Sequence, residues 1–147
     1  MKDLDLPRIL IVDDDESLLA AMARLLRGRF NVTVATNGKQ AMQLVASGAP
    51  VAVAVVDLQM PGMDGLALLF CIRSAAPNTV GILLTGHADL DAAITAVNQG
   101  NIYRFLTKPC SPAVLLAALE AAVEQHRLLV AGRASLRFPA DSTPAAQ

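Results

Sequence analysis

Short apolar runs alternate along the chain with longer segments in which apolar residues recur every three or four positions. The runs, rich in valine, isoleucine and leucine, predict buried β-strands, and the segments between them predict helices. The expected strands are Arg8–Val12, Asn31–Ala35, Val51–Val56, Thr79–Leu84 and Ile102–Leu106. The expected helices run from about Glu16 to Arg27, from a cap at Thr36 or Asn37 to Ser47, from Gly65 to Ala75, from Ala88 to Gln99 and from Ala113 to Val130. This alternation predicts βαβ units around a parallel sheet.

The third expected strand, Val51–Val56, is apolar at every position. A strand that is apolar on both faces belongs in the middle of a sheet that helices cover on both sides. We therefore expect an α/β fold, a doubly wound five-stranded parallel sheet in a three-layer sandwich. It occupies residues 8–131, after an N-terminal extension of residues 1–7. Residues 132–147 lack apolar periodicity and are expected to form a flexible tail.

Composition narrows the class of protein. The 147 residues suit one domain, and no apolar run approaches the roughly 20 residues that span a bilayer. The N-terminus lacks the apolar stretch of a secretory signal, and two isolated cysteines, Cys71 and Cys110, suit a reducing compartment, so we expect a cytoplasmic protein without membrane contact. A formal net charge of −1 offers no basic surface for nucleic-acid phosphates, which argues against direct DNA binding.

Polar residues follow four of the five expected strands. Asp13 and Asp14 follow the first strand, Asp57 the third, Thr85 the fourth and Lys108 the fifth. The carboxyl ends of parallel strands meet at one edge of a doubly wound sheet, where ligands bind. An unpaired charge at the end of a buried strand is costly, but carboxylate oxygens are ligands that Mg²⁺ prefers. The pattern therefore favours a magnesium site.

Each of these signals also has a purely structural interpretation. The aspartates can cap the helix that follows them, and Asp15 has no other evident role. Lys108 and Pro109 can form a surface turn, and the Thr85 hydroxyl can bind the backbone of its own loop. Taken singly, these interpretations are at least as good as the functional one. Four polar signals at four strand ends favour function when they are taken together.

The motifs ILIVDDD, VVDLQMPGMDG, LLTGHAD and FLTKP, in this order, resemble those of the CheY-like receiver domains of two-component response regulators. The resemblance covers about residues 8–130 and implies a flavodoxin-like fold. It implies that Asp57 accepts a phosphoryl group in the presence of Mg²⁺. Lys108 would supply a positive charge to the phosphoryl oxygens, and the Thr85 hydroxyl would supply a hydrogen bond.

The same resemblance implies a ligand set and partners. Asp14 and Asp57 would bind Mg²⁺ directly, Asp13 would act through water, and the backbone carbonyl of Gln59 would be a further ligand. The phosphoryl donor would be a sensor histidine kinase or a histidine phosphotransfer protein. The chain would not be an enzyme beyond assisting its own phosphorylation and dephosphorylation.

Phosphorylation is expected to change the surface of the domain through Thr85 and an aromatic residue. Phe105 lies three residues before Lys108, where related receivers hold their switch aromatic. Tyr103 is a rival, because GNIYRFLTKP is one residue longer than the commoner form. The responding surface, which would dock a partner or a second copy, consists of the fourth helix, fifth strand and last helix. Small residues of the fourth helix would belong to it, namely Ala92, Ala93, Thr95 and Ala96. The Lys108–Pro109 peptide bond is expected to be cis.

Two other functions fit parts of the pattern. A phosphatase of the haloacid dehalogenase type also uses a strand-end aspartate with magnesium, and Asp13 to Asp15 contains its D-x-D pattern. The small size, the absent cap domain and the central position of Asp57 oppose it. A flavodoxin-like FMN module is disfavoured, because aromatic residues are few and the first strand ends in acids. The sequence leaves open whether the receiver stands alone or belongs to a longer protein with an output domain.

Overall fold

The computed structural model describes residues 6–86 and 89–135. In this part of the chain, parallel strands form one sheet in the order β2-β1-β3-β6-β7. Its strands are β1 (Arg8–Val12), β2 (Asn31–Ala35), β3 (Val53–Asp57), β6 (Val80–Thr85) and β7 (Arg104–Thr107). The expected doubly wound five-stranded sheet is confirmed.

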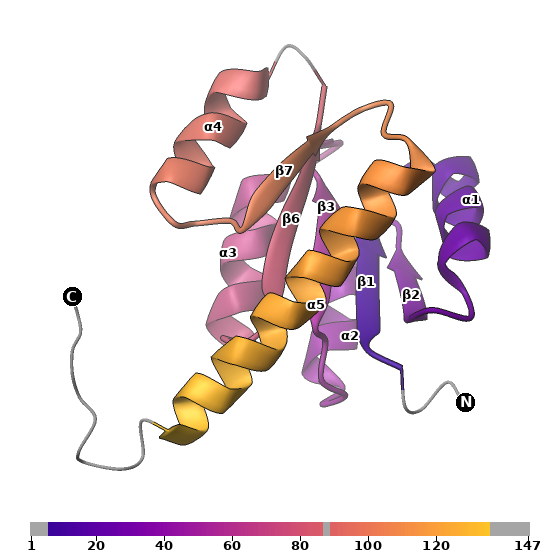
Figure 1. Ribbon diagram of the computed structural model, residues 1–147. Helices are drawn as coiled ribbons and strands as arrows, with labels where there is room; N and C mark the ends of the chain where they lie inside the picture. The colour runs from indigo at the N-terminus through magenta and orange to yellow at the C-terminus, as the bar shows by residue number, and fades with distance from the viewer. Residues whose placement is uncertain (1–5, 87–88, 136–147) are drawn as a thin grey trace.

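Helices cover both faces of the sheet (Figure 1). In the described residues they are α1 (Glu16–Leu26), α2 (Gly38–Ala46), α3 (Gly65–Ala75), α4 (Leu90–Asn98) and α5 (Pro112–Ser135). One apolar core joins α1 and α5 to the sheet, and a second core on the opposite face joins α2, α3 and α4 to it. In the part of the chain described, no helix has the length and apolarity needed to cross a bilayer.

The central strand β3 is buried along its whole length. It pairs with β1 on one side and with β6 on the other, so Val53 lies in register with both Ile9 and Val80. Its side chains enter both apolar cores alternately, as the period of two in a strand requires. The position expected for the all-apolar strand is thus confirmed.

The strands that carry polar end residues lie one or two residues later than the apolar pattern indicates. β3 includes Asp57, because the next residue, Leu58, donates its N–H to the carbonyl of Leu84 at 2.8 Å. β6 includes Thr85, whose carbonyl accepts the N–H of Lys108 at 2.9 Å. Backbone pairing continues through these polar residues, whereas apolar character stops before them.

A two-stranded hairpin follows β3, within the segment that carries the motif VVDLQMPGMDG. Its strands are β4 (Gln59–Met60) and β5 (Met63–Asp64), which pair antiparallel. In the turn between them, Gly62 adopts the positive φ of 75° that a glycine tolerates. Strands of two residues are too short to leave a periodic signal in the sequence.

The last helix is longer than expected, because α5 reaches Ser135 and does not end near Val130. The added residues include two alanines and an arginine, which are good helix formers, beside Gly132, which is a poor one, and they carry no apolar stripe that a sequence pattern would register. The expected tail therefore has its first residues in α5, and residues 136–147 lie outside the described part. The expected start of α4 at Ala88 also lies outside it, and the helix is described from Leu90.

Two of the four small residues expected on the surface of α4 lie in the core instead. Ala93 and Ala96 are buried, whereas Ala92 and Thr95 are exposed. Residues three apart share a face of a helix, so this pair forms the stripe that packs on the sheet. The expected docking role is therefore wrong for Ala93 and Ala96.

Candidate functional site

Acidic and basic side chains from three strand ends meet at the carboxyl edge of the sheet. Carboxylate oxygens of Asp13, Asp14 and Asp57 lie within 4.8 Å of one another. The ammonium Nζ of Lys108 lies 2.9 Å from Oδ2 of Asp13 and 3.3 Å from Oδ1 of Asp57. The residues that the strand-end pattern singles out are therefore brought together, with a lysine between two carboxylates.

Burial shapes the electrostatics of this cluster. Asp13 is 0% exposed and Asp57 7% exposed, whereas Asp14 faces the solvent. Burial raises the pKa of Asp57, and the negative charge of Asp13 raises it further. The charge and hydrogen bond of Lys108 and a hydrogen bond from the Gln59 backbone oppose this shift without cancelling it. The ionised Asp57 carboxylate is therefore held in surroundings that disfavour its charge.

Lys108 compensates part of that charge. Burial alone would lower its pKa, but the hydrogen bond and charge of Asp13, followed by those of Asp57, outweigh burial and raise the pKa. The ammonium group is thus kept protonated beside the two carboxylates. It forms a fixed positive charge at the point where the strand ends converge.

Asp13 is fully engaged by its neighbours. One of its oxygens accepts the hydrogen bond from Lys108, and the other accepts the backbone N–H of Asp15 at 2.9 Å. Asp15 itself caps α1, because its side chain accepts the N–H of Leu18 at 3.1 Å. The structural interpretation is therefore correct for Asp15.

Thr85 lies beside the cluster and is 1% exposed. Its hydroxyl donates to the carbonyl of Gly86 at 3.1 Å, which is the local loop contact that the structural interpretation foresees. The backbone of Thr85 also accepts the N–H of Lys108, so these two residues are fixed relative to each other. The Lys108–Pro109 peptide bond is cis, as expected.

The two aromatic candidates lie in different cores. Phe105 is half-buried against the core that contains α4, whereas Tyr103 packs against the core that contains α5. Phe105 is in register with Leu83 of β6, and the next pairs bring Thr107 opposite Thr85. Of the two, Phe105 is the one that packs on the α4 side of the sheet.

Gly65 supports the site in a way that sequence reasoning missed. Its N–H donates to the carbonyl of Leu58 at 2.8 Å, so the start of α3 lies directly against the loop that follows Asp57. A Cβ atom at Gly65 would collide with the backbone carbonyl of Asp57 and with the Cα of Leu58. Asp64 caps α3 by accepting the N–H of Leu66 at 2.9 Å. In the sequence, the glycine that follows this cap residue is explained equally well as a helix start.

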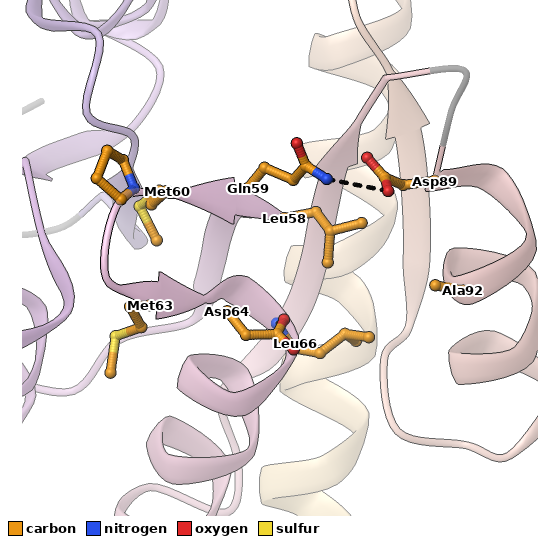
Figure 2. A pocket seen from close by; sticks show the side chains of 9 residues that line it. Leu58, Gln59, Met60, Met63, Asp64, Leu66, Asp89 and Ala92 are labelled. Atoms are coloured by element: carbon orange, nitrogen blue, oxygen red, sulfur yellow. Dashed lines mark hydrogen bonds between the residues drawn. The ribbon is translucent and has the colours of Figure 1, made fainter.

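A second missed contact joins the hairpin to α4. The side-chain amide of Gln59 donates to Oδ1 of Asp89 at 3.1 Å (Figure 2). Gln59 is expected to contribute its backbone carbonyl, and its side chain is a separate connection between the loop after Asp57 and the residue that precedes α4. No sequence pattern indicates a pair of residues so far apart along the chain.

Comparison with known proteins agrees with this geometry. The family described as "Response regulator receiver domain" matches residues 9–120. The DNA-binding transcriptional regulator NtrC of Escherichia coli is 38% identical over 118 residues, which cover 80% of this chain and 25% of that protein. The chain thus spans about a quarter of the length of this curated relative.

Solved structures give the same result. A structure titled adenylate cyclase from Rhodopirellula baltica superposes with a TM-score of 0.87 and 39% identity, covering 90% of this chain and 98% of that chain. A response regulator receiver domain protein from Clostridium thermocellum gives a TM-score of 0.78 and 31% identity, with coverage of 84% and 99%. Fold, strand-end residues and relatives agree, and the chain belongs to the receiver-domain family of two-component response regulators.

Proposed function

We propose that this chain accepts a phosphoryl group on Asp57 from a sensor histidine kinase or a histidine phosphotransfer protein. The observation that carries the proposal is Lys108, which lies within 3.3 Å of Asp57 and 2.9 Å of Asp13 in a cluster of three carboxylates. A buried carboxylate beside a fixed positive charge, at the edge of a parallel sheet, is suited to act as a nucleophile toward phosphorus.

The donor set fits Mg²⁺, a hard cation that favours oxygen ligands and often takes one or two carboxylates with phosphate oxygens. Asp14 and Asp57 would hold the ion directly, Asp13 through water, and the Gln59 carbonyl would complete the protein ligands. Their carboxylate oxygens lie within 4.8 Å of one another, which supports a shared site. Bound Mg²⁺ supplies positive charge that reduces the repulsion between Asp57 and the phosphoryl oxygens.

In the transfer, an Asp57 carboxylate oxygen attacks phosphorus and forms the P–O bond of an aspartyl phosphate. The P–N bond of the donor phosphohistidine breaks, and its electron pair stays on the leaving imidazole nitrogen. Lys108 exchanges part of its contact with Asp57 for a phosphoryl oxygen. The Thr85 hydroxyl leaves the Gly86 carbonyl and donates to a second oxygen.

The movement of Thr85 would pass the change to α4 and β7. When the hydroxyl turns toward the phosphoryl group, space opens beside Phe105, and the half-buried ring turns inward. The surface formed by α4, β7 and α5 then changes, and a partner or a second copy would dock there. Phe105 is favoured over Tyr103, because it packs in the core that includes α4.

The proposal gives this chain the phosphoacceptor step alone, in the cytoplasm, where receivers meet their kinases. NtrC is a DNA-binding transcriptional regulator, but the net charge of −1 of this chain does not support direct contact with DNA. The chain would assist its own phosphorylation and dephosphorylation and would catalyse no other reaction. The D-x-D pattern of a phosphatase gains no support, because the family that matches the chain is the receiver domain of response regulators.

The test is incubation with acetyl phosphate with and without Mg²⁺. Wild type should acquire one phosphoryl group, labile to hydroxylamine, only when Mg²⁺ is present. Asp57→Asn should acquire none, and Asp64→Asn, which changes an exposed acid outside the cluster, should behave as wild type. Equal labelling of Asp57→Asn would refute the assignment of the acceptor. Continuous release of phosphate that persists in Asp57→Asn but is lost in Asp13→Asn would favour the phosphatase.

A further inference from the structure

A groove runs between α3 and α4 on the face of the sheet that carries α2. α3 packs against α2, β3 and β6, whereas α4 packs against β6 and β7. Two adjoining cavities, of about 660 Å³ and about 420 Å³, share Leu66 of α3 and Ala92 of α4. We call their union the α3–α4 groove. It reaches from the β4–β5 hairpin, shown in Figure 2, to Asn101 beyond the end of α4.

The groove is apolar along its floor. Leu58 and Met60 line the end near the hairpin, and Leu66 lies where the two cavities meet. Phe70 forms part of the wall farther along α3 and is 69% exposed, the most open of the large apolar side chains in the described residues. The helix opposite contributes small side chains there, including Ala92, so nothing in α4 fills the space beside Phe70.

The rim of the groove is acidic. Asp64 and Asp89 line the cavity at the hairpin, and Asp91 lines the cavity beside Phe70. No lysine, arginine or histidine is among the described residues that line either cavity. Asp64 accepts a backbone N–H and Asp89 accepts the Gln59 amide, and both donors are neutral. Arg73 of α3 lies at the far end of the groove, where its guanidinium donates to the carbonyls of Gly100 and Asn101. Along the rest of the groove the three acids lie beside an apolar floor without a cation among the described lining residues.

The hairpin end of the groove is held in place before any partner arrives. The hydrogen bond of 3.1 Å from Gln59 to Asp89 links β4 to the start of α4 (Figure 2). Gly65 fixes the start of α3 against the same loop through its bond to Leu58. A preformed groove lowers the entropic cost of docking.

We propose that the α3–α4 groove docks a short amphipathic helix of a partner protein, with apolar side chains on one face and lysine or arginine beside them. The nine residues of α4 correspond to about 13 Å of helix axis, which admits two to three turns with anchors at i, i+3 or i+4, and i+7. Apolar anchors would cover Leu66 and Phe70, and the basic residues would face Asp64, Asp89 and Asp91. The inference does not depend on phosphorylation of Asp57.

The probe is a fluorescent helical peptide of about 14 residues, long enough to form a marginal helix on its own, with leucine at the anchor positions and lysine elsewhere. A second peptide carries glutamate in place of lysine. Binding to the unphosphorylated full chain is followed by fluorescence anisotropy, and the contact surface by amide chemical shifts. The lysine peptide should bind at least tenfold more tightly than the glutamate peptide. Its affinity should fall as the salt concentration rises, and its binding should shift the amide signals of α3, α4 and the hairpin.

The double variant Phe70→Ala, Asp91→Lys should lower the affinity for the lysine peptide at least tenfold. The matched control combines Leu128→Ala with Glu124→Lys, exposed residues of the same types on α5, and should change affinity less than twofold. Because all four side chains are exposed, circular dichroism should show both variants folded. Unchanged affinity in the groove variant, or shifts confined to other surfaces, would overturn the proposal. Sedimentation that shows a dimer lost only in the groove variant would overturn it in favour of a second copy.

Discussion

The carboxyl group of Asp57 is buried beside Asp13, and its pKa is raised mainly by burial. A raised pKa means that the folded protein holds this proton more strongly than the unfolded chain does. The free energy of unfolding therefore falls as the pH rises from the unfolded to the folded pKa of Asp57. Above the folded pKa this loss stays constant. Lys108 has the opposite effect, because its own raised pKa stabilises the fold at neutral pH and is lost only in strongly alkaline solution.

A first prediction is that Asp57→Asn raises the free energy of unfolding at pH 7 in the absence of Mg²⁺. The neutral amide removes the charge that the site disfavours, and we expect a gain on the order of 1 kcal/mol, the scale of a typical single substitution. The gain should shrink as the pH falls and Asp57 of the wild type becomes protonated. Urea unfolding across a pH series measures it.

Addition of Mg²⁺ should reverse this order, because the ion stabilises the wild type by binding its native state and loses a ligand in Asp57→Asn. Asp91→Asn, an exposed acid of α4, is the control and should match the wild type with and without the ion. A variant Asp57→Asn that is less stable than wild type at pH 7 without Mg²⁺ would contradict the prediction.

The second prediction at the residue scale concerns Gly65. Gly65→Ala places a methyl group against the backbone of Asp57 and Leu58, and overpacking of this kind costs about 1 to 3 kcal/mol. The loop that carries Asp57 must shift to relieve the collision, so phosphorylation by acetyl phosphate should also slow.

Gly132→Ala is the matched control for that variant. Its added methyl group would meet no atom within 4 Å, and alanine favours the helix by up to about 1 kcal/mol over glycine. Chemical denaturation and phosphorylation rates should separate the two variants. Equal stability and equal phosphorylation rates in the two variants would contradict the prediction, because they would show that the loop accommodates the methyl group at no cost.

At the scale of elements, the coupling of β6 to β7 and α4 can be tested through Thr85. Beryllofluoride, a mimic of the phosphoryl group, should change amide exchange in α4 and β7 of the wild type. In Thr85→Ala the response of these elements should be largely lost, because the hydroxyl that would turn toward the mimic is absent. Thr95→Ala, an exposed threonine of α4, should respond as the wild type does. An equal response in wild type and Thr85→Ala would disprove the coupling.

The elements show what a sequence can and cannot predict. The bounds of β1, β2 and α3 match the expectation, because apolar runs and end signals such as Asp64 coincide there. β3 and β6 run through Asp57 and Thr85, because backbone hydrogen bonds ignore side-chain polarity. The hairpin after β3 depends on pairing between two very short strands and leaves no local signal.

In the candidate site, too, features with a local sequence signal could be predicted and features set by tertiary contacts could not. Asp57, Thr85 and Lys108 could be located from the sequence, since a parallel sheet brings its strand ends together. The paired hydrogen bonds that Asp13 accepts from Lys108 and from the backbone N–H of Asp15 could not be predicted, because they depend on side-chain packing. The Gln59–Asp89 contact is likewise tertiary, set by where α4 lies against the hairpin.

For the whole molecule, the extended end of α5 gives a prediction about the domain boundary. The helix projects past the sheet (Figure 1), and Leu128 is 58% exposed near that end. A chain shortened to residues 1–131 should therefore keep its free energy of unfolding to within about 0.5 kcal/mol, as expected for changes at the surface. Thermal unfolding and Mg²⁺ titration of the two chains make the comparison. A loss of several kcal/mol, or weaker binding of Mg²⁺, would place residues 132–147 within the folded domain.

The order of the strands in the sheet has a consequence for the protein during its synthesis. The segment from β1 through β4 leaves the ribosome before β6 and β7, and it already contains every proposed metal ligand. Lys108 follows the edge strand β7, which has no place in the sheet until β6 has added to β3. A nascent chain can thus gather the acids while it still lacks the cation that balances them. Under the proposed function, the chain could accept a phosphoryl group only when the last strand is in place. Unfinished chains would therefore not be phosphorylated.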